Sequence, residues 1–131
     1  MNAGNLVPDE VLLEIMHSTL TELQDSGVIL DGFPRTIPQA IGLSKIFQSL
    51  NQAIDIIINI EVNKDVLIKR LVERAEKSGR PDDTEEVIVN RQNVYSDLTA
   101  PLIEFYQSNI IHIDGDGSIN QVTERILKRI P

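Results

Sequence analysis

Arginine side chains gather in the middle of this 131-residue chain. Five of its seven arginines lie there: Arg35, Arg70, Arg74, Arg80 and Arg91. The guanidinium group is a planar, permanently charged fork that matches the oxygens of a phosphate. Ordinary surface charge explains any one of these residues. Together, in a chain with a formal net charge of −8, they favour an anionic ligand that is smaller than a polymer.

A second segment combines several residue types that suit phosphate chemistry. It follows a short apolar run and reads Asp31-Gly32-Phe33-Pro34-Arg35. A carboxylate at a strand's end can hold a water molecule of Mg²⁺, and a glycine permits close approach to the backbone. The Phe33-Pro34 pair stiffens the turn, and Arg35 offers a fork to a phosphate. The alternative for these five residues alone is a routine strand-to-helix turn.

Composition excludes several other kinds of site. The chain has no cysteine, so disulfides, cysteine zinc sites and thiolate nucleophiles are ruled out, and His17 and His112 are too few for a histidine metal cage. The net charge of −8 argues against nucleic-acid and anionic-membrane partners. No apolar run approaches the roughly 18–20 residues that span a bilayer, and no secretory signal is present. We therefore expect a cytoplasmic protein.

Hydrophobic periodicity predicts alternating helices and strands. Helices are expected at 8–27, 38–50, 63–77 and 84–106 (bent near Pro101) and after a capping box of Ser118 and Gln121, and strands at 28–30, 54–62 and 110–113. Residues 78–83 read as a loop. The continuous apolar strands predict burial on both faces, so the fold class is an α/β domain with a parallel sheet and flanking helices.

The same periodicity predicts which residues share a helix face. Arg70 and Arg74 are one turn apart and point the same way. The apolar faces expected of the first and last helices are Val11, Leu12, Ile15, Met16, Leu20 and Leu23, and Val122, Ile126 and Ile130. In parallel sheets the ligand lies beyond the carboxyl ends of the strands, which selects the turns 31–35 and 114–117.

The order of several motifs resembles the nucleoside monophosphate kinases, and among them the adenylate kinase family. These motifs span the chain in the family's order: Gly4-Asn5-Leu6-Val7-Pro8-Asp9, then Asp31 to Arg35 with Gln39-Ala40, Arg70-Leu71-Val72-Glu73-Arg74, Gly79-Arg80-Pro81-Asp82-Asp83, Asn90-Arg91 and Thr99-Ala100-Pro101-Leu102. The resemblance implies a single domain over 1–131, with the end of an AMP-binding region near 1–25 and a short lid near 75–83.

The resemblance implies the residues of an AMP site. They are Asn5, Leu6, Val7, Gly32, Phe33, Pro34, Arg35, Gln39, Arg80 and Arg91. Arg35 would hold the AMP phosphate. Gln39 would read adenine, because a primary amide both donates and accepts along a base edge, whereas pyrimidine kinases typically carry asparagine at this position. Without that context Gln39 is a solvated glutamine early in a helix.

The resemblance also implies ATP-binding and catalytic residues. Arg70, Arg74 and Gly117 would bind ATP, with Gly117 contacting the base through its backbone. The catalytic arginines would be Arg35, Arg74, Arg80 and Arg91. Asp31 would bind Mg²⁺ through water. The short lid implies that zinc is not used, and the reaction implied is reversible phosphoryl transfer from MgATP to AMP, giving two ADP.

One family feature is missing from the sequence. No lysine here follows a glycine, so a Gly-x-x-x-x-Gly-Lys-Ser/Thr phosphate loop cannot exist in these 131 residues. The family carries that loop after its first strand, which is central, and we expect this chain to begin after both. We therefore expect an incomplete sheet and negligible activity from the isolated chain. Members of the family are usually monomeric, but this chain is expected to need a partner strand, strand swapping or rearrangement.

Three other functions remain open at this point. The first is a UMP or CMP kinase, and the second is a non-catalytic remnant that binds AMP or a protein partner. The third is a signalling receiver phosphorylated on Asp31. A receiver also needs a lysine at the end of a late strand, where this chain has Asp114-Gly115, so the sequence disfavours it.

Overall fold

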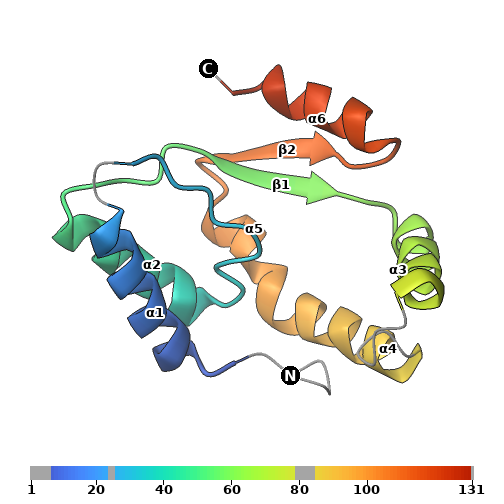
Figure 1. Ribbon diagram of the computed structural model, residues 1–131, viewed down its shortest axis with the longest axis horizontal. Coiled ribbons are helices and arrows are strands. Elements are labelled where there is room, and N and C mark those ends of the chain that lie inside the picture. Colours follow the sequence, from blue (N-terminus) through green and yellow to red (C-terminus); the bar gives the residue numbers. More distant parts are fainter. Residues whose placement is uncertain (1–6, 24–25, 79–84, 131) are drawn as a thin grey trace.

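The structure is a computed structural model that describes residues 7–23, 26–78 and 85–130. Its elements in chain order are α1 (Asp9–Glu22), α2 (Ile37–Ser49), β1 (Ile57–Glu61), α3 (Lys64–Ser78), α4 (Glu85–Val94), the π-helical turn η1 (Tyr95–Thr99), α5 (Pro101–Phe105), β2 (Ile110–Asp114) and α6 (Ile119–Leu127). None of the helices in these ranges is both long and apolar enough to cross a bilayer. The predicted α/β class is confirmed (Figure 1).

A parallel pair of strands organises the part of the sheet that is described. Ile57 lies opposite Ile110, and the register continues to Glu61 opposite Asp114. The two strands therefore end at the same edge, and the backbone N–H of Gly115 adds a bond of 2.7 Å to the carbonyl of Glu61 just beyond it. The strands predicted at 54–62 and 110–113 are confirmed, as is their parallel direction.

The predicted burial of the first of these strands on both faces is wrong. The Ile60 side chain is 49% exposed, and the other residues of β1 are exposed or only partly buried. The flanking helices pack mainly elsewhere: α6 lies along β2, while α1 packs on α2 and α2 on α5 (Figure 1). An isoleucine-rich run thus forms a strand here without the two covering layers that usually accompany such a run.

The strand predicted at 28–30 does not form. The backbone there has no regular secondary structure and pairs with no strand among the described residues, and Ile29 is 95% exposed. Strand formation depends on a hydrogen-bonded neighbour and on cover for the side chains more than on intrinsic preference. An apolar run of three residues gives neither, so the prediction from composition failed.

The main core lies between α1 and α2. Leu20, Leu43 and Ile46 are buried, and partly buried residues surround them: Leu13, Met16, Leu30, Phe33, Phe47, Leu50 and Ile54. The face predicted for α1 is right for Met16 and Leu20 but wrong for Val11, Ile15 and Leu23, which are 40–52% exposed. Leu13 packs inward because Gly42 leaves room for it: a Cβ at Gly42 would lie 2.5 Å from the Leu13 Cδ1.

Helix boundaries follow local hydrogen bonding. Gln39 N–H donates to the Thr36 hydroxyl at 3.2 Å, which caps α2, and the predicted capping box of Ser118 and Gln121 is confirmed at the start of α6. The first helix ends at Glu22, before the predicted Gly27.

The helix predicted from 84 to 106 is broken, as expected, near Pro101. The N–H of Ala100 donates to the carbonyl of Tyr95 at 2.8 Å, a five-residue step that makes η1 a π-helical turn. Pro101 then opens α5, a position where its missing N–H has no partner to lose. The break therefore involves the turn before the proline as well as the proline itself.

The contribution of the exposed run at 28–30 to the free energy of unfolding can be compared directly with that of the core. We expect Leu20→Ala to lower the free energy of unfolding by about 2–5 kcal/mol, because it empties a fully buried site. Ile29→Ala, the matched control, should change it by less than about 0.5 kcal/mol because Ile29 packs on little. Urea unfolding measures both. A large loss at Ile29 would contradict the description of this segment.

Tyr106 provides a test at alkaline pH. Its hydroxyl is buried without a hydrogen-bond partner among the described residues, and burial raises the pKa of the phenol above its ordinary value. Its contribution to stability is therefore present below about pH 10 and is lost as the pH rises through the raised pKa. We expect Tyr106→Phe to reduce that alkaline loss.

At pH 8 the same substitution should leave the free energy of unfolding unchanged or raise it by up to about 1 kcal/mol, because an unpartnered buried hydroxyl is removed. Urea unfolding at pH 8 and pH 11 (about one pH unit above the ordinary pKa of tyrosine) measures both effects. Tyr95→Phe, at an exposed tyrosine, is the control and should retain the alkaline loss. An identical pH dependence in the Tyr106→Phe variant would refute the prediction.

Candidate functional site

The turn 31–35 holds an exposed guanidinium group against its own backbone. Gly32 has φ of 70°, a conformation that favours glycine, and its carbonyl accepts a bond of 2.7 Å from Arg35 Nε. A Cβ at Gly32 would lie 3.0 Å from Arg35 Nη2, so a larger residue would crowd the guanidinium. Arg35 is nevertheless exposed, and its remaining N–H groups can reach an anion.

A buried glutamine fixes this turn to two helices. Gln39 is 0% exposed; its Oε1 accepts from the backbone N–H of Arg35 at 2.7 Å, and its Nε2 donates to Asp9 Oδ1 at 2.7 Å. The Thr36 hydroxyl donates to the other oxygen of Asp9 at 3.1 Å. Gln39 is therefore not a solvated helix residue. Its amide joins α1, the start of α2 and the backbone that carries Arg35.

Two further contacts place the turn relative to the rest of the chain. Phe33 packs against the core of α1 and α2. The hydroxyl of Thr99, in η1, donates to the carbonyl of Arg35 at 2.9 Å. Because η1 continues α4, this bond brings the turn near the helix that carries Arg91.

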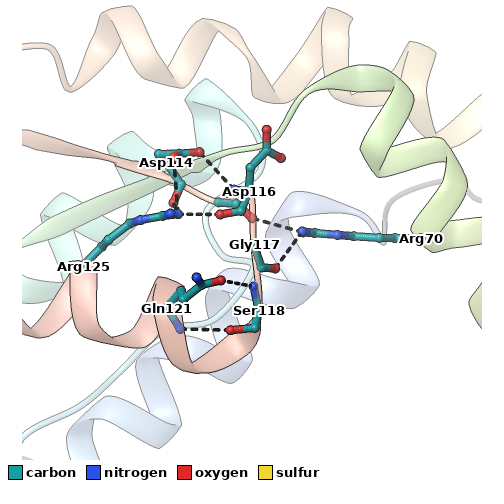
Figure 2. Close-up of polar contacts among 8 residues, drawn as sticks. Arg70, Asp114, Asp116, Gly117, Ser118, Gln121 and Arg125 are labelled. Carbon is teal, nitrogen blue, oxygen red and sulfur yellow. Dashed lines mark hydrogen bonds and ion pairs between the residues drawn. The ribbon is translucent and has the colours of Figure 1, made fainter.

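At the end of β2, the structure brings two predicted ATP-binding residues into contact. Arg70, from α3, donates through Nη1 to the carbonyl of Gly115 and through Nη2 to that of Gly117, both at 3.1 Å. Gly117 has φ of 117°, which requires glycine in practice. The turn 114–117 and the exposed Arg70 thus form one polar surface (Figure 2).

The other predicted residues are placed less completely. Val7 and Pro34 are partly buried; Arg74 and Arg91 are partly buried on α3 and α4, which pack against each other. Asn5, Leu6 and Arg80 lie outside the described residues, as do Asp82 and Asp83 of the lid motif. A single cleft shared by Arg35, Arg74, Arg80 and Arg91 therefore stays a prediction.

The donor set near the turn 31–35 fits magnesium only in company with phosphates. Asp31 is an exposed carboxylate, and the described part of the chain has no cluster of three His, Cys, Asp or Glu side chains arranged to hold a metal ion. Mg²⁺ is commonly held by one or two carboxylates together with substrate phosphates and water. Asp31 could serve in that way.

Sequence reasoning missed several residues of these surfaces. Asp9 and Thr99 were named only as members of family motifs, Thr36 was given no role, and Arg125 was left outside the arginine cluster. Each acts through a hydrogen bond to a residue at least nine positions away or to a backbone carbonyl. The spacing of residue types carries no signal for such bonds. Thr36, three residues before Gln39, could have been found as a helix cap.

The Gln39 network gives a direct prediction for stability. We expect Gln39→Leu to lower the free energy of unfolding by about 1–3 kcal/mol, because it leaves the Arg35 N–H and an Asp9 oxygen without their partner. Gln48→Leu, on the exposed side of the same helix, is the matched control and should change it by less than about 0.5 kcal/mol. Chemical denaturation measures both. Equal effects of the two substitutions would argue against the network.

Comparison of the sequence with known proteins gives matches to one family. The model of the adenylate kinase family matches residues 1–111. The chain is 47% identical to an adenylate kinase of Leptospira biflexa, in an alignment that covers 99% of this chain and 72% of the relative. It is 45% identical to an adenylate kinase of a Synechococcus strain, covering 98% of this chain and 69% of the relative. An adenylate kinase of Maricaulis maris is 43% identical, with 96% and 69% covered. The chain belongs to the adenylate kinase family.

Proposed function

We propose that the chain provides the AMP site and part of the ATP site of an enzyme that transfers a phosphoryl group reversibly from MgATP to AMP, giving two ADP. The family supports nucleoside monophosphate kinase activity in general. The observation that carries the more specific proposal is the turn 31–35, where a buried amide and a glycine hold an exposed guanidinium group in place.

The proposed AMP site is built on that turn. Arg35 binds the phosphate, because its fork matches two phosphate oxygens and its Nε is already oriented by the Gly32 carbonyl. In this proposal Gln39 reads the base edge, which requires that its amide, fully buried and bonded to Arg35 and Asp9 in this structure, becomes exposed when AMP binds. The site as proposed includes Asn5, Leu6, Val7, Gly32, Phe33, Pro34, Arg35, Gln39, Arg80 and Arg91. The end of an AMP-binding region near 1–25 and a lid near 75–83 belong to the same single-domain proposal.

The proposed ATP site lies at the end of β2. Arg70 lies beside the base, Gly117 contacts it through the backbone, and Arg74 is nearer the phosphates. The short distance between Arg70 and the carbonyl of Gly117, 3.1 Å, supports a shared ligand for these two residues. Arg80 and Arg91 act at the transferred phosphoryl group.

Phosphoryl transfer requires these residues to orient the nucleotides and to neutralise negative charge. An oxygen of the AMP phosphate forms a bond to the γ-phosphorus of ATP while the bond from that phosphorus to the bridging oxygen breaks, which leaves ADP on both sides. The transition state is loose and spreads negative charge over the phosphoryl oxygens. Arg35, Arg74, Arg80 and Arg91 would neutralise that charge, and closure of the lid would exclude water. Mg²⁺, bound with ATP, supplies further charge neutralisation, and Asp31 would hold it through water.

The isolated polypeptide lacks one part of this machinery. None of its lysines follows a glycine, so these 131 residues contain no phosphate loop of the Gly-Lys type. Such a loop supplies backbone amides and a lysine to the ATP phosphates. We therefore expect negligible turnover when MgATP and AMP are given to this polypeptide alone. A coupled assay of ADP formation measures it, and turnover at the rate of ordinary kinases, about 1–100 s⁻¹, would contradict the prediction.

Binding of AMP can be tested without turnover. We expect calorimetry to detect AMP, and Arg35→Ala to weaken its binding by about 2–5 kcal/mol, because a charge-assisted contact to the phosphate is lost. Arg129→Ala removes the same charge from an exposed position just after α6 and should leave AMP affinity unchanged. UMP and CMP should bind more weakly than AMP. Unchanged affinity in the Arg35→Ala variant would refute the assignment, and a preference for a pyrimidine nucleotide would favour a UMP or CMP kinase.

A further inference from the structure

Two guanidinium groups hold four consecutive carbonyls of the turn 114–117 from opposite sides (Figure 2). Arg125, from α6, donates through Nη1 to the carbonyl of Asp114 at 2.7 Å and to that of Asp116 at 2.5 Å. Arg70 holds the carbonyls of Gly115 and Gly117. Carbonyls thus alternate in direction along the turn, with the even-numbered ones facing α6 and the odd-numbered ones facing α3.

Arg125 is tied to the turn by side-chain contacts as well. Its Nη1 lies 3.3 Å from Asp114 Oδ2, and Asp114 Oδ1 accepts from the backbone N–H of Asp116 at 3.0 Å. The N–H of Gly115 is bonded to β1, and the capping box joins Ser118 to α6. The ends of the turn are therefore fixed by strand pairing and by the helix cap, while its carbonyls are held by the two arginines.

A bound nucleotide would affect the contacts of the two arginines differently. Arg70 is the residue proposed above to lie beside the base of ATP, on the side of the turn that faces α3. The amino group of a base there would compete with the Arg70 guanidinium for the carbonyls of Gly115 and Gly117. Arg125 lies on the other side, where it would keep its contacts when the base binds.

We propose that Arg125 is a positioning residue for the base of ATP: by holding the carbonyls of Asp114 and Asp116, it keeps those of Gly115 and Gly117 directed at the nucleotide. The proposal rests on the ATP site proposed above. Carbonyl oxygens accept hydrogen bonds and cannot donate them, so a turn held in this way suits a base edge that carries an amino group and disfavours one that carries a carbonyl.

Titration of the ¹⁵N-labelled chain with MgATP tests the proposal, because NMR measures weak binding and needs no turnover. In the unaltered chain, MgATP should shift the amide resonances of Gly115 and Gly117, and MgGTP should do so only at higher concentration. In Arg125→Ala the dissociation constant for MgATP read at these resonances should rise about tenfold, the size expected for loss of charge-assisted bonds. Arg129→Ala should leave it unchanged.

Two further readouts separate positioning from a general loss of structure. AMP affinity, followed at the Gly32 amide, should be unaltered in Arg125→Ala. Arg125→Lys should recover most of the MgATP affinity, because a single nitrogen of Arg125 makes both carbonyl contacts and an ammonium group also has several donors.

Specific outcomes would overturn the proposal. They are equal MgATP affinity in Arg125→Ala and the unaltered chain, a parallel loss of AMP affinity, or no response of Gly115 and Gly117 to MgATP in the unaltered chain. Failure of the proposed AMP site would look different, because Arg35→Ala would then leave the response at Gly32 unchanged whatever happens at Gly115 and Gly117.

Discussion

The parallel register of β1 and β2 is the constraint on which the described part of the ATP site depends. Because Glu61 lies opposite Asp114, both strands end at one edge, where β1 leads into α3 and β2 leads into the turn 114–117. The bond from Gly115 N–H to the carbonyl of Glu61 extends the pairing by one step. That extension sets the turn beside α3 at a distance that a single arginine side chain spans. A slip of the register by one residue would reverse the faces of β2 and move the turn away from Arg70.

The surface formed by the turn 31–35 depends on buried polar contacts and not on sheet pairing. Asp9, Thr36 and Gln39 join α1 to the start of α2, and the Gln39 amide continues into the backbone of Arg35. Polar groups buried in this way keep their stabilising effect only while all are paired, so they specify one arrangement of the turn. The core of Leu20, Leu43 and Ile46 packs the same two helices without fixing where the guanidinium of Arg35 lies.

The contrast between the regions that were predictable and those that were not has physical causes. The strand at 110–114, the helices α2 and α3 and the capping box of Ser118 are determined by patterns within a few residues, and all of them formed as predicted. Val28 to Leu30 needed a neighbouring strand that no local pattern reveals. The roles of Arg125 and Thr99 depend on carbonyl groups, and a carbonyl is present at every position, so the residue sequence does not mark which ones are used. The burial of Gln39 has the same origin, because a glutamine early in a helix has no distinctive pattern of its own.

The proposals for the two surfaces require that this chain binds AMP at Arg35 and ATP at Arg70. The most direct test is a crystal structure of the chain grown with AMP and MgATP together. We predict two separate nucleotides, with the AMP phosphate within hydrogen-bond distance of the Arg35 guanidinium. The ATP base should lie between Arg70 and the backbone of Gly117, and Arg125 should still be bonded to the carbonyls of Asp114 and Asp116. Nucleotides bound at surfaces away from Arg35 and Arg70, or an ATP base on the α6 side of the turn, would contradict this arrangement.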